Sequence, residues 1–156
     1  MRTTTVLALL ATAGITLSGC STSVTTTSFN PHCTAAPTCP VTLEITAMGS
    51  ACQISNPGTI KVDKGRSPVI TWELVDKTGV GYQFPRNGID FVVKPGFATP
   101  NATTFVVHGP GPATVFRVTD NYRDAKDEGT FNYKVTVVKP DGSRGCELDP
   151  PIYNGP

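Results

Sequence analysis

Regular alternation of apolar and polar residues is the feature that most constrains what this chain folds into. In the stretch VTLEITA (41–47), Val41, Leu43 and Ile45 fall on one side of an extended backbone, with polar side chains mostly on the other. The same period of two recurs in TIKVD (59–63) and PVITWEL (68–74). Because side chains alternate across a strand, this pattern predicts β-strands that each bury one face.

Further strands are predicted along the rest of the chain, and turn sequences separate them. The turns combine Gly and Pro with Asn or Asp, as in Asn56-Pro57-Gly58, Arg86-Asn87-Gly88 and Pro140-Asp141-Gly142, and these residues suit tight turns. About eight short strands, with turns roughly every 8–12 residues, are typical of an all-β sandwich. The remaining predicted strands lie at 80–84, 89–94, 103–108, 113–119 and 130–138.

Residues 1–20 have the pattern of an export signal. Arg2 supplies one positive charge, and the uncharged run from Val6 to Leu17 is shorter than the roughly 20 residues that a membrane-spanning helix needs. The run ends in Leu17-Ser18-Gly19-Cys20: an aliphatic residue, a small one, glycine and cysteine. This ending resembles the lipobox of bacterial lipoprotein signal peptides. The resemblance implies cleavage before Cys20 and acylation of both its thiol and its new amino group.

An acylated Cys20 predicts a permanent attachment to the membrane. Each buried methylene contributes about 0.8 kcal/mol, so several acyl chains anchor a protein where a single chain is marginal. In Gram-negative lipoproteins an Asp after the cysteine often signals retention in the inner membrane. Ser21 therefore implies, through the resemblance, an outer-membrane protein that faces the periplasm. The alternatives are an ordinary cleaved signal followed by a stray cysteine and the apolar N-terminus of a soluble protein.

The chain divides into a signal peptide (1–19), a tether (20–39) and one domain (40–156). The tether is nearly uncharged and rich in Ser, Thr, Pro and Ala, a composition that predicts flexibility because it buries little apolar surface. Without Arg2, the 12 acidic side chains balance the remaining basic ones. This balance argues against nucleic acid as a partner and leaves the acyl chains on Cys20 as the attachment to the membrane.

Four cysteines remain once Cys20 is assigned to lipid. An even number exported to an oxidising compartment favours two disulfides, for which three pairings are possible. We prefer Cys33–Cys39, which closes a local loop, together with Cys52–Cys146, which joins an early strand to the C-terminal segment. Zinc is a poor alternative, because there is no Cys-x-x-Cys pair and His32 is the one histidine nearby.

Two stretches resemble known sandwich families. DEGTFNYKVTVV (127–138) resembles the D-x-G-x-Y-x-C strand of immunoglobulin-like domains, with Phe131 at the tyrosine position and Tyr133 at the cysteine position. Trp72 matches the buried tryptophan of such cores. The chain is also similar to cupredoxins, in which I-x-V-x-x-G and V-x-W precede G-T-[FY]-x-Y. Both resemblances imply a single Greek-key β-sandwich, immunoglobulin-like or cupredoxin-like, and neither dictates function.

The residue types do not predict a metal site or a cofactor. A blue copper site needs two imidazoles and a thiolate, but no histidine or methionine follows Tyr133. The acidic run DNYRDAKDE (120–128) lacks the ligand spacing of a calcium-binding loop. We interpret this run as a solvated loop in which Arg123 and Lys126 balance the acidic charge.

The predicted role is binding or structural rather than catalytic. The chain has no G-x-S-x-G, H-E-x-x-H or phosphate-loop motif. Aromatic residues are typical of binding surfaces, and the candidates are Tyr82 and Phe84, whose shared strand face also fits packing, and Phe97 in a loop. The expected partner is an envelope protein or polymer. The alternative is an envelope hydrolase or an inhibitor of an envelope enzyme, with His108 as the one imidazole in the predicted domain. A serine or carboxylate within hydrogen-bond reach of His108 would favour catalysis.

The lipobox leads to a direct prediction. The Cys20→Ala substitution removes the thiol that forms the thioether. We therefore expect it to abolish palmitate labelling and to leave the precursor unprocessed by the lipoprotein pathway. Metabolic labelling of the variant and the wild type, followed by electrophoresis, is the measurement. Equal labelling of the two proteins would contradict the anchor.

Overall fold

The computed structural model describes residues 29–33, 37–49, 51–110 and 113–156, so the signal peptide, Cys20 and much of the predicted tether lie outside the described residues. The described residues form strands, loops and one 3-10 turn, η1 (Ala125–Asp127). No helix among them has the length and apolar character to cross a membrane. The strands are β1 (Phe29–Cys33), β2 (Thr38–Met48), β3 (Ala51–Ile54), β4 (Thr59–Val62), β5 (Val69–Asp76), β6 (Ile89–Phe91), β7 (Phe105–Pro110), β8 (Val115–Asp120), β9 (Gly129–Val138), β10 (Arg144–Leu148) and β11 (Pro151–Asn154).

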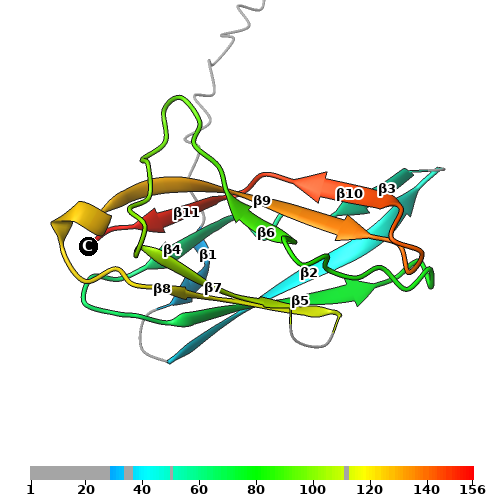
Figure 1. The fold of residues 1–156 in the computed structure, drawn as a ribbon, viewed down its shortest axis with the longest axis horizontal. Helices are drawn as coiled ribbons and strands as arrows, with labels where there is room; N and C mark the ends of the chain where they lie inside the picture. The colour runs from blue at the N-terminus through cyan, green and yellow to red at the C-terminus, as the bar shows by residue number, and fades with distance from the viewer. Residues whose placement is uncertain (1–28, 34–36, 50, 111–112) are drawn as a thin grey trace, which may run out of the picture.

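The strands form two mixed sheets that pack against each other as a β-sandwich (Figure 1). One sheet has the order β1-β4-β11-β9-β10, with β6 also paired to β9, and the other has the order β3-β2-β5-β8-β7. β2 and β5 run parallel, from Thr38 opposite Val69 to Ile45 opposite Asp76. β4 is parallel to both β1 and β11. The all-β sandwich predicted from the sequence is confirmed.

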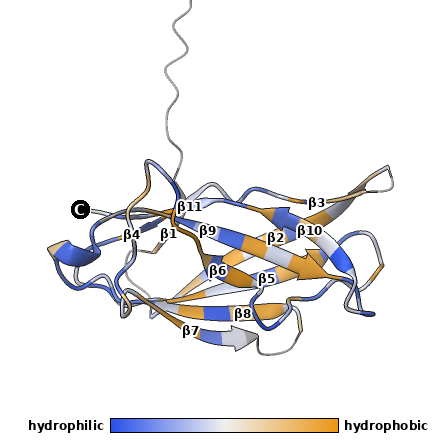
Figure 2. Ribbon diagram, turned by 45° about the horizontal axis from the view of Figure 1, so that its top comes forward, coloured by the Kyte–Doolittle hydropathy of each residue, from blue (hydrophilic) through white to orange (hydrophobic). Residues whose placement is uncertain are grey.

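The alternating apolar residues form the core between the sheets. Along β2 every second residue from Cys39 to Ile45 is buried, and β5 buries Ile70, Trp72 and Leu74 in the same way. Figure 2 shows apolar residues interleaved with hydrophilic ones along the strands, whereas η1 is mostly hydrophilic. The faces that the period of two assigned to the core are therefore the buried ones.

A tryptophan–tyrosine pair joins the two sheets at the centre of the core. Trp72 on β5 and Tyr133 on β9 are fully buried, and their ring centroids lie 5.3 Å apart. The Trp72 Nε1–H donates a hydrogen bond of 3.3 Å to the Tyr133 hydroxyl, so both buried polar groups have a partner. Burial raises the pKa of Tyr133, which keeps the phenol neutral.

Five segments differ from the strands predicted by alternation. Residues 80–84 form a loop with a single bridge from Gln83 to Val138 instead of a strand. β1, β3, β10 and β11 were not predicted, because they have only four or five residues each and carry too few alternations to stand out. β1 contains Pro31, which an edge strand tolerates because no neighbour needs its missing N–H.

The folded domain begins before residue 40. β1 pairs with β4, which sets Cys33 opposite Val62, and both Cys33 and Cys39 are buried in the core. Residues 29–33 and 37–39, assigned to the tether from their composition, therefore belong to the sandwich. Strand pairing and the burial of the two cysteines stabilise a segment that is otherwise poor in core side chains.

The two disulfides of the described residues have the pairing preferred from the sequence. Cys33–Cys39 links the end of β1 to the start of β2 across a sequence separation of 6. Cys52–Cys146 links β3 to β10 across a separation of 94. Since β3 ends one sheet and β10 ends the other, the second disulfide fastens the two sheets together along one side.

The longer disulfide should stabilise the fold more than the shorter one. In the chain-entropy treatment, a closed loop of 94 residues contributes about 4–5 kcal/mol, and a loop of 6 residues contributes about half of that. The Cys52→Ser/Cys146→Ser variant should therefore lose about twice as much unfolding free energy as Cys33→Ser/Cys39→Ser. Urea titration followed by tryptophan fluorescence measures both losses. A larger loss for the short pair would contradict the prediction.

Candidate binding surface

Two of the three aromatic residues predicted for the binding surface belong to the core. Tyr82 is 6% exposed and Phe84 is 4% exposed. The Tyr82 ring lies on Gly145 of β10, so closely that an added Cβ there would come within 2.9 Å of it. Phe84 packs edge-on against Phe116 of β8, with centroids 5.6 Å apart. Distant strands cover both side chains, so neither forms the exposed surface expected from the sequence, although Tyr82 also lines a surface hollow.

Phe97 is half-buried in the loop between β6 and β7. Its N–H donates to the Lys94 carbonyl at 3.1 Å, and the following Ala98 N–H donates to the Thr130 carbonyl of β9 at 2.7 Å. These bonds hold the loop against β9. Val93, in the same loop, is 66% exposed. The loop therefore presents one apolar side chain to solvent and a second one in part.

His108 is exposed on β7, the end strand of its sheet. Its Nε2 lies 2.7 Å from the Thr119 hydroxyl on β8. Within the part of the chain that the structure describes, no serine hydroxyl or carboxylate forms a hydrogen bond with this ring. The geometry that would favour a general base at His108 is therefore not formed by these residues.

The acidic run differs from the solvated loop expected from the sequence. Asp124 is exposed and pairs with Lys126 at 3.3 Å, but Asp120 and Asp127 are buried. The η1 turn directs Asp127 inward, where its Oδ1 accepts a hydrogen bond from the Thr104 hydroxyl at 2.8 Å. Among the described residues, no group of three or more His, Cys, Asp or Glu side chains gathers as it would around a metal ion.

A hollow of about 230 Å³ lies at one end of the sandwich. Three connections meet at this end: the β2–β3 hairpin, the β5–β6 loop and the β9–β10 turn (Figure 1). We refer to this feature as the loop-end hollow. Its lining residues are Ala47, Gly49, Ala51, Cys52, Thr78, Val80, Tyr82 and Lys139.

Large apolar side chains stand exposed at the loop-end hollow. Val80, in its wall, is 45% exposed, and Met48, between two lining residues, is 65% exposed. Neither was predicted from the sequence, because Val80 lies in a loop without periodicity and Met48 ends β2 on its exposed face, where polar side chains are expected. The available signal was a valine between two glycines, Gly79 and Gly81, where a strand neighbour is not expected. Tyr82 reaches the same hollow from the core side.

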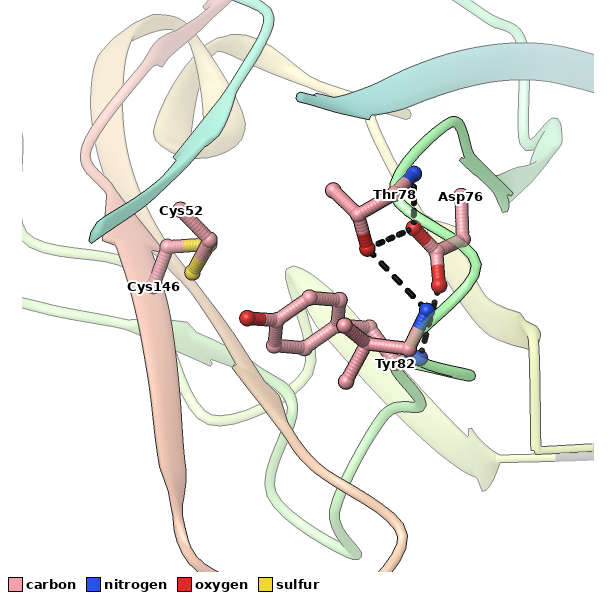
Figure 3. The surroundings of a disulfide bond; sticks show 6 residues. Cys52, Asp76, Thr78, Tyr82 and Cys146 are labelled. Atoms are coloured by element: carbon pink, nitrogen blue, oxygen red, sulfur yellow. Dashed lines mark hydrogen bonds between the residues drawn. A yellow bond between two sulfur atoms is a disulfide. The ribbon is translucent and has the colours of Figure 1, made fainter. Parts of the chain in front are cut away.

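Asp76 holds the β5–β6 loop in shape (Figure 3). Its Oδ1 accepts hydrogen bonds from the N–H and the hydroxyl of Thr78, at 2.7 and 2.6 Å. Its Oδ2 accepts from the N–H groups of Gly81 and Tyr82, at 2.7 and 3.2 Å. Burial acts to raise the pKa of Asp76, but these four bonds together outweigh it and lower the pKa to about 2. The carboxylate is therefore charged at neutral pH, where it stabilises the loop.

The Cys52–Cys146 disulfide and the Asp76 loop lie on opposite sides of the Tyr82 ring (Figure 3). Cys52 lines the loop-end hollow directly, and Cys146 follows the glycine on which the ring lies. One covalent bond and one carboxylate with four hydrogen bonds thus frame the hollow. A surface framed in this way is preorganised, so it loses less conformational entropy when a partner binds.

Two other hollows have a different character. Neither includes any of the large exposed apolar residues found in the described parts of the chain. One, of about 280 Å³, lies between β1, β2 and the β3–β4 loop and is lined by Pro31, Pro40, Val41, Thr42 and Pro57. The other, of about 260 Å³, is polar and is lined by Thr103, Asn121, Arg123, Asp124, Lys126 and Asp127.

Comparison of the chain with models of protein families, with curated proteins and with solved structures finds no match. The loop-end hollow combines a rigid frame with exposed apolar side chains, a combination suited to recognition.

The Asp76 cluster leads to a prediction about stability. Asp76→Ala removes the acceptor of four hydrogen bonds and should lower the unfolding free energy by about 1.5–3 kcal/mol at pH 7. Asp141→Ala is the matched control, because exposed Asp141 accepts a bond from the Ser143 N–H in the neighbouring turn; its effect should stay within about 0.5 kcal/mol. Urea titration measures both variants.

The effect of Asp76→Ala should also depend on pH. The folded-state pKa of Asp76 is lowered to about 2 from an ordinary value of 3.8. The stabilisation is therefore complete above about pH 4 and is lost as the pH falls through about 2. The difference in unfolding free energy between wild type and variant should narrow over this window. If the difference stayed constant down to pH 2, the charge on Asp76 would not be its cause.

Proposed function

We propose that this chain is a lipid-anchored protein of the bacterial cell envelope, whose β-sandwich binds another envelope protein without catalysing a reaction. The observation that carries the proposal is the loop-end hollow, with Val80 exposed in its wall and Met48 exposed between two of its lining residues in the chain. Apolar side chains placed around a rigid hollow leave water only when a partner covers them. Contacts of this kind supply much of the binding energy of protein interfaces.

The size of the hollow favours a protein partner over a small molecule. Ligand pockets typically have volumes of roughly 300–1,000 Å³ and enclose most of the ligand, whereas this hollow has about 230 Å³. One apolar side chain of a partner, inserted between Val80 and Tyr82, would fill much of that space. Exposed Lys139 at the edge would then remain available to a carboxylate at the polar rim of the interface.

The proposed location rests on the N-terminal sequence and agrees with the cysteine chemistry. The Leu17-Ser18-Gly19-Cys20 ending supports lipidation at Cys20, and Ser21 supports the outer membrane with the domain facing the periplasm. Two disulfides among the described residues fit an exported protein, since such bonds persist in oxidising compartments. In this arrangement the acyl chains bind the membrane and the sandwich binds the partner.

The alternative covers two different functions, a hydrolase and an inhibitor of an envelope enzyme. A hydrolase that uses His108 has little support, because the described hydrogen-bond partner of this exposed ring is the Thr119 hydroxyl. An inhibitor of an envelope enzyme is itself a binding protein, and it agrees with the same surface. The β6–β7 loop, with Val93 exposed and Phe97 half-buried, is the second candidate surface.

Site-specific photo-cross-linking in intact cells tests the proposed surface. A photoreactive phenylalanine analogue placed at Met48 or Val80 in the full-length protein should cross-link to a partner protein, because Val80 is exposed in the wall of the hollow and Met48 is exposed next to two lining residues. The same probe at Val107, which is 49% exposed on β7, is the matched control and should give no product. Cross-links from Val93 or Val107, without any from Met48 and Val80, would contradict the assignment.

A substitution then separates binding from folding. Once mass spectrometry has identified the cross-linked partner, Val80→Asp should weaken its binding at least about tenfold, or about 1.4 kcal/mol, because a carboxylate replaces the apolar contact. The melting temperature should change little, since Val80 is exposed. Val107→Asp serves as the control with the same change in charge. Unchanged affinity for Val80→Asp would contradict the proposed surface.

A further inference from the structure

A buried polar cluster joins three elements at the end of the sandwich opposite the loop-end hollow. Asp120, the last residue of β8, has no exposed surface. Its Oδ1 accepts a hydrogen bond of 3.1 Å from the Asn154 Nδ2 of β11. The same Nδ2 donates to the Asp127 carbonyl of η1, also at 3.1 Å. Asp120 and Asn154 therefore connect β8, β11 and η1 around one carboxyl group.

The cluster contains two carboxyl groups and no basic partner for either. Among the described residues, neither Asp120 nor Asp127 has a Lys, Arg or His nitrogen within ion-pair distance. Asp127 lines the polar hollow near Lys126, where water has access to the wall, whereas Asp120 lies deeper. An ionised carboxylate in such a place is costly, because burial removes its hydration and the hydrogen bonds that remain come without a compensating positive charge.

The hydrogen bonds of Asp120 are also incomplete for a carboxylate. Among the residues that the structure describes, its Oδ2 is buried without a hydrogen-bond partner, and so is the Asn154 Oδ1. A charged oxygen left in this state has lost its water and gained no donor. A proton on Oδ2 removes the charge and leaves the Oδ1 bond from Asn154 unchanged.

We propose that Asp120 acts as a pH-sensitive latch: it keeps its proton in the folded protein, and the loss of that proton loosens the contact of β11 with β8 and η1. The groups that face Asp120 are consistent with this role. The Asp120 N–H donates to the Pro68 carbonyl, which lies just before β5, and Phe105 of β7 is the strand partner of Asp120. Neither Pro68 nor Phe105 carries a charge. Asp127 from η1 adds negative charge, and Tyr122, whose N–H acts on Asp120, donates its own hydroxyl to Glu128.

The direction of the pKa shift agrees with the geometry. Burial raises the pKa of Asp120 to about 7, and the charge of Asp127 adds to the rise, against the lowering by the Asn154 bond and the Tyr122 N–H. The ordinary value is 3.8. The folded chain therefore binds a proton that the unfolded chain releases between about pH 4 and pH 7, so stability decreases as the pH rises through this window and the loss is complete above it.

The test compares Asp120→Asn, a neutral isostere, with wild type from pH 5 to pH 8.5. The unfolding equilibrium constant of wild type should rise by up to about tenfold per pH unit through this group, and Asp120→Asn should lack that part of the slope. Histidines in general change charge in the same range. The quantity of interest is therefore the difference between the two proteins in the pH dependence of the unfolding equilibrium constant. Asp124→Asn, an exposed carboxyl four residues away, should keep the wild-type slope.

Two further measurements keep the proposal open to refutation even if Asp120→Asn does not fold. The ¹³C resonance of the Asp120 carboxyl in wild type should titrate near pH 7, and a midpoint near 4 would overturn the latch. Hydrogen exchange, corrected for intrinsic rates, should show faster opening of residues 151–154 at pH 8 than at pH 5.5. If millimolar Ca²⁺ instead abolished the pH slope of the wild type, Asp120 would bind a cation, and the neutral-acid proposal would be wrong.

Discussion

The contact between Trp72 and Tyr133 is the interaction on which the rest of the structure depends. It joins β5 to β9, which lie inside their respective sheets, and it occupies the centre of the core. Both side chains carry a polar atom into a region without water. The indole N–H can only donate, and the phenol oxygen accepts it. The indole N–H therefore has its acceptor in the phenol oxygen, and this bond and the ring contact join the two sheets across the core.

The two ends of the sandwich solve different physical problems. At the loop end, the Cys52–Cys146 disulfide and the Asp76 carboxylate hold three connections in place, so that exposed Met48 and Val80 sit on a rigid frame. Asp76 lies near the surface with four donors, which favours its charged form. At the opposite end Asp120 has one oxygen without a donor and no access to water. The same residue type thus favours opposite protonation states, because burial and hydrogen bonding differ.

The candidate site was only partly predictable from the sequence. Tyr82 and Phe84 were predicted for the surface because aromatics between turns resemble binding residues, but Gly145 and Phe116 cover them. Val80 was missed because alternation carries no information on loops, and Met48 because it is an apolar residue on the exposed face of β2. Asp120 and Asp127 were assigned to solvent because acidic runs usually are solvated. Their burial depends on Asn154 and Thr104, which the chain brings from other elements.

By itself the sequence determined which face of each long strand is buried, since the period of two is a local property of the extended backbone. It also favoured the two disulfides, through the number and spacing of the cysteines, and it contains the lipobox-like ending at Cys20. Only the tertiary structure decided which strands are neighbours, such as the parallel β2 and β5, and which loops meet at the hollow. These features arise from contacts between segments far apart in the chain, and no local pattern of residues encodes them.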